Sequence, residues 1–297
     1  MADLFLLRDK RSAGASFVGF LVLSVAVFWP VLAQWVRYSR EHESSSHVFL
    51  IPFISAGLVY RSRRTIFEGH RTSFDLGTIL ILAGLSGYWL VTKESAQWAG
   101  GDRLAGMALA IVTIWMGGFI FFFGPRCFRK GLFPLLFLLF MVPIPSLLLD
   151  EITFQLRKGS TAVAYGLFAF LEVPVFREGF RLSLPDLNIE VARECSGIRS
   201  SLALVITCLL AGHITLHSWW RKGLLWLLAI PLAILKNGLR IVCISLLGIY
   251  VDRGFLSGNL HSRGGIVFFL TALLVLSFFL WILHKSESTV QRQWSGL

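Results

Sequence analysis

Long apolar runs separated by short polar connections dominate the chain. Eight runs come close to the length of about 17 to 25 residues at which an α-helix spans a bilayer core of about 30 Å. They lie near residues 16–36, 44–60, 76–92, 104–124, 131–149, 197–216, 223–249 and 264–284. The pattern therefore predicts an all-α polytopic membrane protein with eight transmembrane helices.

Composition agrees with this prediction. Hydrophobic residues make up 55% of the 297 residues, and the mean hydropathy is +0.70. Soluble domains use about 45 to 50% apolar residues, so a soluble class is excluded. Only a short polar tail follows the last apolar run, so we expect no appended soluble domain and one integral membrane domain over residues 1–297.

Charge sets the expected orientation of the helices. Five connections are rich in Lys and Arg, namely residues 1–15, 61–75, 125–130, 217–222 and 285–297. Together they hold 14 basic and 5 acidic residues, whereas the other connections hold 11 basic and 12 acidic residues. Basic residues resist translocation and concentrate in cytoplasmic connections, so both termini are expected in the cytoplasm. The net charge of +11 then mostly reports topology, and nucleic acid is not an expected partner.

Two segments between the fifth and sixth runs complete the expected fold. Topology requires residues 150–172 to begin and end on the outer face, as an interfacial or re-entrant helix does. Residues 173–194 alternate apolar and polar positions, with turn signals at Glu178-Gly179 and Pro185-Asp186. They predict a small β-meander that caps the outer face.

Basic residues inside the expected helices are the first functional signal. Arg199, Lys236 and Arg240 lie within apolar runs, where a charge costs about 2.5 to 3.5 kcal/mol at the helix centre. In ILKNGLRIV, Lys236, Asn237 and Arg240 share one helix face because they are three and four residues apart. Arg240 is expected about 14 Å below the outer end of its helix. We therefore predict a wet cavity that opens to the outer face.

A thiol and an imidazole are expected on that same face. Cys195, in EVARECSGIRSS, precedes the sixth helix, and His261, in SGNLHSRGG, precedes the eighth. A thiolate is favoured as a nucleophile at a helix N-terminus and beside cations. His261 can protonate a leaving amine, and Arg240 can hold an oxyanion. The predicted catalytic residues are Cys195, Arg240 and His261, and the predicted substrate-binding residues are Arg199, Lys236 and Asn237.

The remaining cysteines and histidines predict no further chemistry. Cys127 is expected in a cytoplasmic connection, and Cys208 and Cys243 within helices as small apolar residues. His213 and His217 have metal-like spacing but no third ligand. Neither a metal nor a cofactor is therefore expected.

Two other functions remain compatible with the same residues. A transporter or lipid-carrier protein could bind a phosphate or carboxylate with Lys236 and Arg240, and Cys195 would then be dispensable. An intramembrane serine protease would use Ser196 or Ser200 with His261. The chain has no HExxH motif, which argues against a zinc protease.

The motifs ECSGIRSS, NGLRIV and HSRGG, in that order and each at the expected outer end of a helix, resemble the exosortase/archaeosortase family of membrane cysteine transpeptidases. The segment SSSHVFLIP and the count of eight helices also resemble that family. The resemblance implies a Cys, Arg and His active site, carried over to Cys195, Arg240 and His261.

The resemblance also implies substrates and a location. The substrates would be secreted proteins with a C-terminal sorting signal: a short motif, a transmembrane helix and a basic cluster. The enzyme would cut between motif and helix and pass the acyl group to an acceptor, for which a polysaccharide or a lipid are candidates. The expected location is the inner membrane of the cell, surrounded by lipid, with the active site on the periplasmic or outer side.

Overall fold

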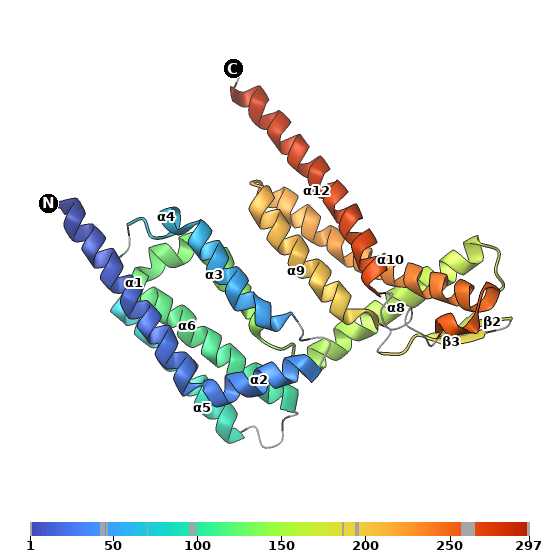
Figure 1. The fold of residues 1–297 in the computed structure, drawn as a ribbon, viewed down its shortest axis with the longest axis horizontal. Helices are drawn as coiled ribbons and strands as arrows, with labels where there is room; N and C mark the ends of the chain where they lie inside the picture. Colours follow the sequence, from blue (N-terminus) through green and yellow to red (C-terminus); the bar gives the residue numbers. More distant parts are fainter. Residues whose placement is uncertain are drawn as a thin grey trace. The chain divides into compact units, whose positions relative to one another are not determined.

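The computed structural model describes residues 2–41, 45, 47–69, 71–94, 98, 100–185, 187–193, 196–256 and 265–295, with side chains from residue 12 to residue 287. Within these ranges the chain is mostly helical, with one small antiparallel sheet. It forms two compact units, Met1–Leu148 and Leu149–Leu297, which run from blue to green and from yellow-green to red in Figure 1. The single membrane domain expected over residues 1–297 stays a prediction.

The first unit is built of helices joined by short connections. In chain order they are α1 (Ala2–Val27), α2 (Trp29–Glu41), η2 (Val48–Leu50), α3 (Ile51–Arg61), α4 (Arg63–Ile66), α5 (Phe74–Glu94), α6 (Gly100–Lys130), α7 (Leu132–Phe137) and η4 (Leu138–Met141). Glycines let the backbones of α5 and α6 approach closely. A Cβ atom at Gly84 would lie 2.6 Å from Ile114, and such small contact residues are typical of helices packed in a membrane.

The first expected transmembrane run, residues 16–36, is bent. Helices α1 and α2 meet at an angle of 73° around Phe28. Pro30 follows two residues later and lies in the first turn of α2. Proline suits the first turn of a helix but has no N–H to continue the hydrogen bonds of the preceding helix, which explains why the run breaks there.

The fifth expected run, residues 131–149, is broken. Its helix ends at Met141, just before Pro143 and Pro145, which cannot donate backbone hydrogen bonds. The indole nitrogen of Trp35 donates to the Met141 carbonyl at 3.0 Å. A broken helix is tolerated in a membrane where neighbouring side chains pair the freed backbone groups.

The cytoplasmic connection expected at residues 125–130 is a continuation of α6, so the prediction that Cys127 lies in a loop is wrong. The helix kinks at Gly124, whose φ is 83°, and resumes at once. Cys127 is 0% exposed and packs in an apolar cluster with Ile66 and Leu135. Burial of Cys127 on one side of this turn, with its basic residues exposed on the other, fits a helical conformation.

The second unit combines helices with the small sheet. Its elements are α8 (Ser146–Phe170), β1 (Phe176–Glu178), β2 (Arg181–Leu184), β3 (Leu187–Glu190), α9 (Ile198–Thr215), α10 (Trp219–Tyr250), η6 (Arg253–Leu256) and α12 (Gly265–Ser295). The expected helix over residues 150–172 is confirmed as part of α8, and the expected meander as three antiparallel strands in the order β1-β2-β3. The outer-face position of both segments stays a prediction.

One face of the sheet packs onto α8 and α10. Leu182 and Leu184 are 0% and 6% exposed, and they form a cluster with Phe168 of α8 and Val242 of α10. Alternate residues of a strand point to opposite faces, so this buried row explains the apolar alternation that predicted the strands. The sheet is thereby held beside the part of α10 that carries the predicted site.

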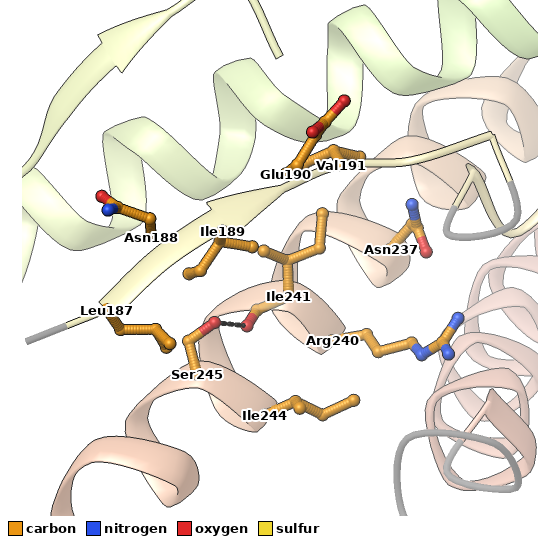
Figure 2. A pocket seen from close by; sticks show the side chains of 10 residues that line it. All are labelled: Leu187, Asn188, Ile189, Glu190, Val191, Asn237, Arg240, Ile241, Ile244 and Ser245. Atoms are coloured by element: carbon orange, nitrogen blue, oxygen red, sulfur yellow. Dashed lines mark hydrogen bonds between the residues drawn. The ribbon is translucent and has the colours of Figure 1, made fainter. Parts of the chain in front are cut away.

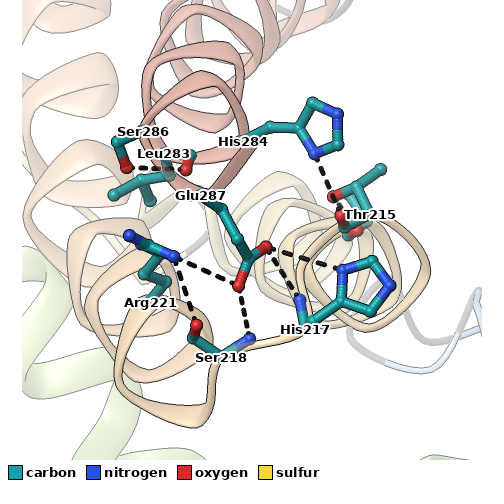
Figure 3. Close-up of polar contacts among 9 residues, drawn as sticks. Thr215, His217, Ser218, Arg221, Leu283, His284, Ser286 and Glu287 are labelled. Atoms are coloured by element: carbon teal, nitrogen blue, oxygen red, sulfur yellow. Dashed lines mark hydrogen bonds and ion pairs between the residues drawn. The ribbon is translucent and has the colours of Figure 1, made fainter. Parts of the chain in front are cut away.

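Helices α9, α10 and α12 pack side by side (Figure 1) and are joined at one end by a polar cluster. The Glu287 carboxylate accepts hydrogen bonds from the backbone N–H groups of His217 and Ser218, at 3.0 and 2.6 Å. It also pairs with Arg221 Nη1 at 3.2 Å (Figure 3). A carboxylate at a helix N-terminus satisfies free donors, so Glu287 ties α12 to the start of α10.

In the part of the chain that the structure describes, five helices are long and apolar enough to cross a membrane. They are α5, α6, α9, α10 and Gly265–Glu287 of α12. Counting each of the two bent helix pairs as one span gives up to seven, and the second expected run, residues 44–60, corresponds to the shorter apolar helix Val48–Arg61. The chain is a polytopic membrane protein, while the count of eight helices and the cytoplasmic termini stay predictions.

Candidate active site

The predicted site residues fall into a described and an undescribed group. Cys195 and His261 lie outside the described residues. Lys236, Asn237 and Arg240 lie on α10, and Arg199 lies in the first turn of α9. The geometry below concerns these four residues and their neighbours.

Gly197 caps the N-terminus of α9, at a backbone position that favours glycine. Gly197 has φ 67° and ψ 23°, in the left-handed region that other residues rarely adopt. A Cβ atom at this position would lie 2.8 Å from Asn237 Oδ1 and 3.6 Å from Lys236 Nζ. The start of α9 therefore packs directly against two of the predicted binding residues.

Lys236 is buried and held by a hydroxyl. Its side chain is 5% exposed, and its Nζ donates to Ser200 Oγ at 2.5 Å. Ser200 Oγ in turn donates to the Gly197 carbonyl oxygen at 3.1 Å. The ammonium group thus lies beside the first turn of α9, linked through Ser200 to the backbone at its start.

Asn237 connects α10 to α8. It is 2% exposed, and its Nδ2 donates to Ser160 Oγ at 3.0 Å. The two helices approach closely here, because a Cβ atom at Gly238 would lie 2.5 Å from Val163. This contact fixes the Asn237 amide in position, since buried polar groups are expensive to leave unpaired.

Arg240 lines a pocket of about 220 Å³ between α10 and β3 (Figure 2). The guanidinium is half-buried and lies on the same side of α10 as the Asn237 amide. Ile189 of β3 and Ile241 and Ile244 of α10 supply apolar lining. A pocket therefore lies beside Arg240, while its water content and its opening to the outer face stay predictions.

Arg199 is not brought into this cluster by any contact between described residues, and its side chain is exposed. Ser196, which directly precedes Gly197, is 0% exposed. The Ser196 hydroxyl has no hydrogen-bond partner in the described part of the chain. The roles predicted for Arg199, Lys236 and Asn237 in substrate binding remain predictions.

Two residues of this network were missed from the sequence. Ser160 and Ser200 hold Asn237 and Lys236, but both resemble ordinary small residues of a packed helix. Only Ser200 carried a sequence signal, because it lies four residues after Ser196 in the motif ECSGIRSS. Ser160 lies in the middle of α8, and no sequence pattern links it to α10.

The arrangement is suited to binding negative or partly negative groups. Lys236 and Arg240 are one helical turn apart, and Asn237 lies between them in sequence. A cation removed from water stabilises an anion or a polarised carbonyl more strongly than an exposed cation does. The site thus belongs to a polytopic membrane protein in which Arg240 lines a pocket and Lys236, one turn earlier on α10, packs against the start of α9.

Comparison with known proteins supplies the family. The family model for transmembrane exosortases matches residues 35–278, so the chain belongs to the transmembrane exosortase family. No curated protein and no solved structure matches the chain. Exosortases are generally membrane cysteine transpeptidases with a sorting function, which agrees with the resemblance found in the sequence.

Proposed function

We propose that the protein is a membrane-embedded cysteine protease and transpeptidase that cleaves the C-terminal sorting signal of secreted proteins. The signal would consist of a short motif, a transmembrane helix and a basic cluster, and cleavage would fall between motif and helix. The site would face the periplasm or the outside from the inner membrane. The acceptor of the acyl group would be a polysaccharide or a lipid.

One observation carries the proposal beyond family membership. The start of α9 at Gly197 packs against Lys236 and Asn237, and Cys195 precedes Gly197 by only two residues. Arg240 follows one turn after Lys236 and lines a pocket. Cations near a thiol favour the thiolate, which is the nucleophilic form.

The proposed reaction has two stages. The Cys195 thiolate attacks the scissile carbonyl carbon, and Arg240 stabilises the negative oxygen of the tetrahedral intermediate. The peptide C–N bond breaks as His261 gives its proton to the leaving amine, and a thioester remains. A hydroxyl or amine of the acceptor then attacks the thioester, gives its proton to His261 and releases the thiolate.

Substitution of the thiol tests this proposal. Cys195→Ala and Cys195→Ser should both abolish cleavage in cells of a secreted reporter that carries the three-part tail, because neither side chain offers a thiolate. Cys243→Ala, at an exposed cysteine on α10, is the matched control and should leave cleavage intact. Immunoblotting of membranes shows whether each variant accumulates. Unchanged cleavage in both Cys195 variants would refute the proposal.

A transporter or lipid carrier is the second candidate, favoured by the pocket beside Arg240. In such a protein Lys236 and Arg240 would bind a phosphate or carboxylate in transit, and the thiol would have no role. The two candidates therefore predict opposite results for Cys195→Ala: loss of function for the transpeptidase and retained function for the carrier.

A further inference from the structure

Strand β3 forms a free edge of the sheet. Within the described residues the strand order is β1-β2-β3, so β3 pairs with β2 on one side only. The Val191 N–H donates to the Phe180 carbonyl oxygen at 3.0 Å, which identifies the residues of β3 that bond toward β2. These are every second residue, so the backbone N–H and C=O groups of Asn188 and the N–H of Glu190 point to the free edge.

The same edge forms one wall of the pocket beside Arg240. Five consecutive residues of the β3 segment, Leu187, Asn188, Ile189, Glu190 and Val191, line this pocket. Successive side chains of a strand point to opposite faces of the sheet. Side chains of one face could supply only every second residue of the lining, so a lining of five consecutive residues must include the backbone edge of the strand. Figure 2 shows Leu187 and Ile189 directed toward α10, and Asn188 and Glu190 directed away from it.

We propose that the free edge of β3 binds the segment of the substrate that precedes its membrane helix, in an extended conformation and as an added strand. This inference rests on the proposed function and specifies how that substrate is held. Backbone hydrogen bonds to Asn188 and Glu190 would supply the affinity, and an apolar side chain of the substrate would enter the pocket between Ile189 and Ile244. The added strand then passes beside Arg240.

The size and lining of the pocket favour a peptide. Its volume of about 220 Å³ is below the about 300 to 1,000 Å³ of typical small-molecule sites, so it suits one side chain better than a headgroup or cofactor. Apolar walls from Ile189, Ile241 and Ile244 match an apolar side chain, and Arg240 matches a polarised carbonyl. Only a peptide would use both the backbone edge and the apolar pocket.

Proline substitution tests the backbone pairing. Asn188→Pro removes an N–H that points to the free edge and leaves the bonds between β2 and β3 intact, because proline is tolerated at such edge positions. The matched control is Arg177→Pro on β1, the opposite edge of the same sheet, where the N–H also points outward. Loss of one backbone hydrogen bond should lower cleavage of the tailed reporter about 2- to 10-fold for Asn188→Pro, and Arg177→Pro should match wild type.

Enlarging the pocket tests the side-chain site with a gain of function. Ile189→Ala should shift cleavage toward reporters with Phe over those with Val at one position before the membrane helix, by about 10-fold or more. A misfolded variant would lose activity toward every reporter and would not change this ratio. An unchanged ratio at every position before the helix would overturn the pocket assignment.

Photocrosslinking separates failure of this inference from failure of the proposed function. A benzophenone amino acid replaces Glu190 in the Cys195→Ala variant, which is expected to bind the reporter without cleaving it, and the same probe replaces Arg177 as the control. Crosslinks from position 190 to the segment before the membrane helix support strand addition. Cleavage by wild type without such crosslinks, and with Asn188→Pro as active as wild type, would overturn strand addition alone. Crosslinks from position 190 only to lipid would mean that the free edge of β3 faces the membrane and would overturn strand addition. Absence of cleavage by the wild type would refute the proposed function.

Discussion

Lys236 Nζ of α10 lies 2.5 Å from Ser200 Oγ in the first turn of α9. The relationship joins a buried cation to the helix that follows Cys195 in the chain. Because Ser200 also bonds the Gly197 carbonyl oxygen, a shift of Lys236 would be transmitted to the start of α9. The pair thus links the charge of the site to the position of its predicted nucleophile.

Ser200→Ala should destabilise the protein by about 1–3 kcal/mol, because it leaves a buried ammonium without this acceptor. The double variant with Lys236→Met should lose less than the sum of the single changes, with a coupling of about 0.5–3 kcal/mol. Thermal unfolding of the purified protein in detergent measures both. Ser286→Ala, which removes an exposed hydroxyl of α12, is the control and should change stability by no more than about 0.5 kcal/mol. Additive effects would show that the Lys236 and Ser200 side chains do not interact.

Gly197→Ala should reduce both stability and cleavage. An alanine held at a φ of 67° costs about 1–3 kcal/mol, and its Cβ would lie 2.8 Å from Asn237 Oδ1. Gly166→Ala within α8 is the matched control, because no atom lies within 4 Å of the added methyl group and alanine favours helix over glycine. Thermal unfolding and reporter cleavage of the two variants should therefore diverge. Equal behaviour would mean that the start of α9 tolerates a side chain.

The apolar runs predicted most of the helices but not where they break. A window of hydropathy finds α9 and α10 because both are apolar along most of their length, and α10 continues through Pro231. It misses the breaks near Pro30 and Pro143, which depend on single residues within an otherwise apolar run. The strands were predictable because one face of the sheet, which includes Leu182 and Leu184, is buried. Burial of one face makes apolar and polar residues alternate along each strand.

Only the charged residues of the candidate site could be predicted from the sequence. Lys236 and Arg240 stood out because a buried cation in an apolar helix is costly. Their partners did not, since a serine costs little anywhere and its role depends on which helix faces meet. The contact of Ser160 with Asn237 spans 77 residues, and local sequence carries no information on such a contact.

Glu287→Gln should destabilise the bundle of α9, α10 and α12 by about 1–3 kcal/mol. The substitution keeps the shape of the side chain but removes the charge that pairs with Arg221 and accepts the backbone N–H groups of His217 and Ser218. Cleavage per folded molecule should stay near wild type, because Lys236 lies 18 residues beyond Ser218 along α10, or about 27 Å. Thermal unfolding and reporter cleavage report the two effects separately.

The exposed ion pair of Glu68 and Lys130 provides the comparison for Glu287. Its N–O distance of 3.1 Å is close to the 3.2 Å between Arg221 and Glu287, but the Glu68 side chain is 74% exposed and that of Glu287 only 8%. Exposed pairs contribute about 0–1 kcal/mol, so Glu68→Gln should have little effect. A loss for Glu68→Gln as large as for Glu287→Gln would contradict a special role for the buried carboxylate.

Arg240→Lys should lower cleavage about 10²- to 10³-fold, the usual effect of removing one donor to a developing oxyanion. Lysine keeps the positive charge but lacks the planar fork of donors that fixes a carbonyl oxygen in one geometry. Arg253→Lys in η6, at an exposed position outside the pocket, is the control and should cleave the reporter like wild type. Single-turnover cleavage in membranes, with expression checked by immunoblot, gives the comparison. Near-normal cleavage by Arg240→Lys would show that the site needs only a positive charge at this position, and would refute the proposed role of the guanidinium at the oxyanion.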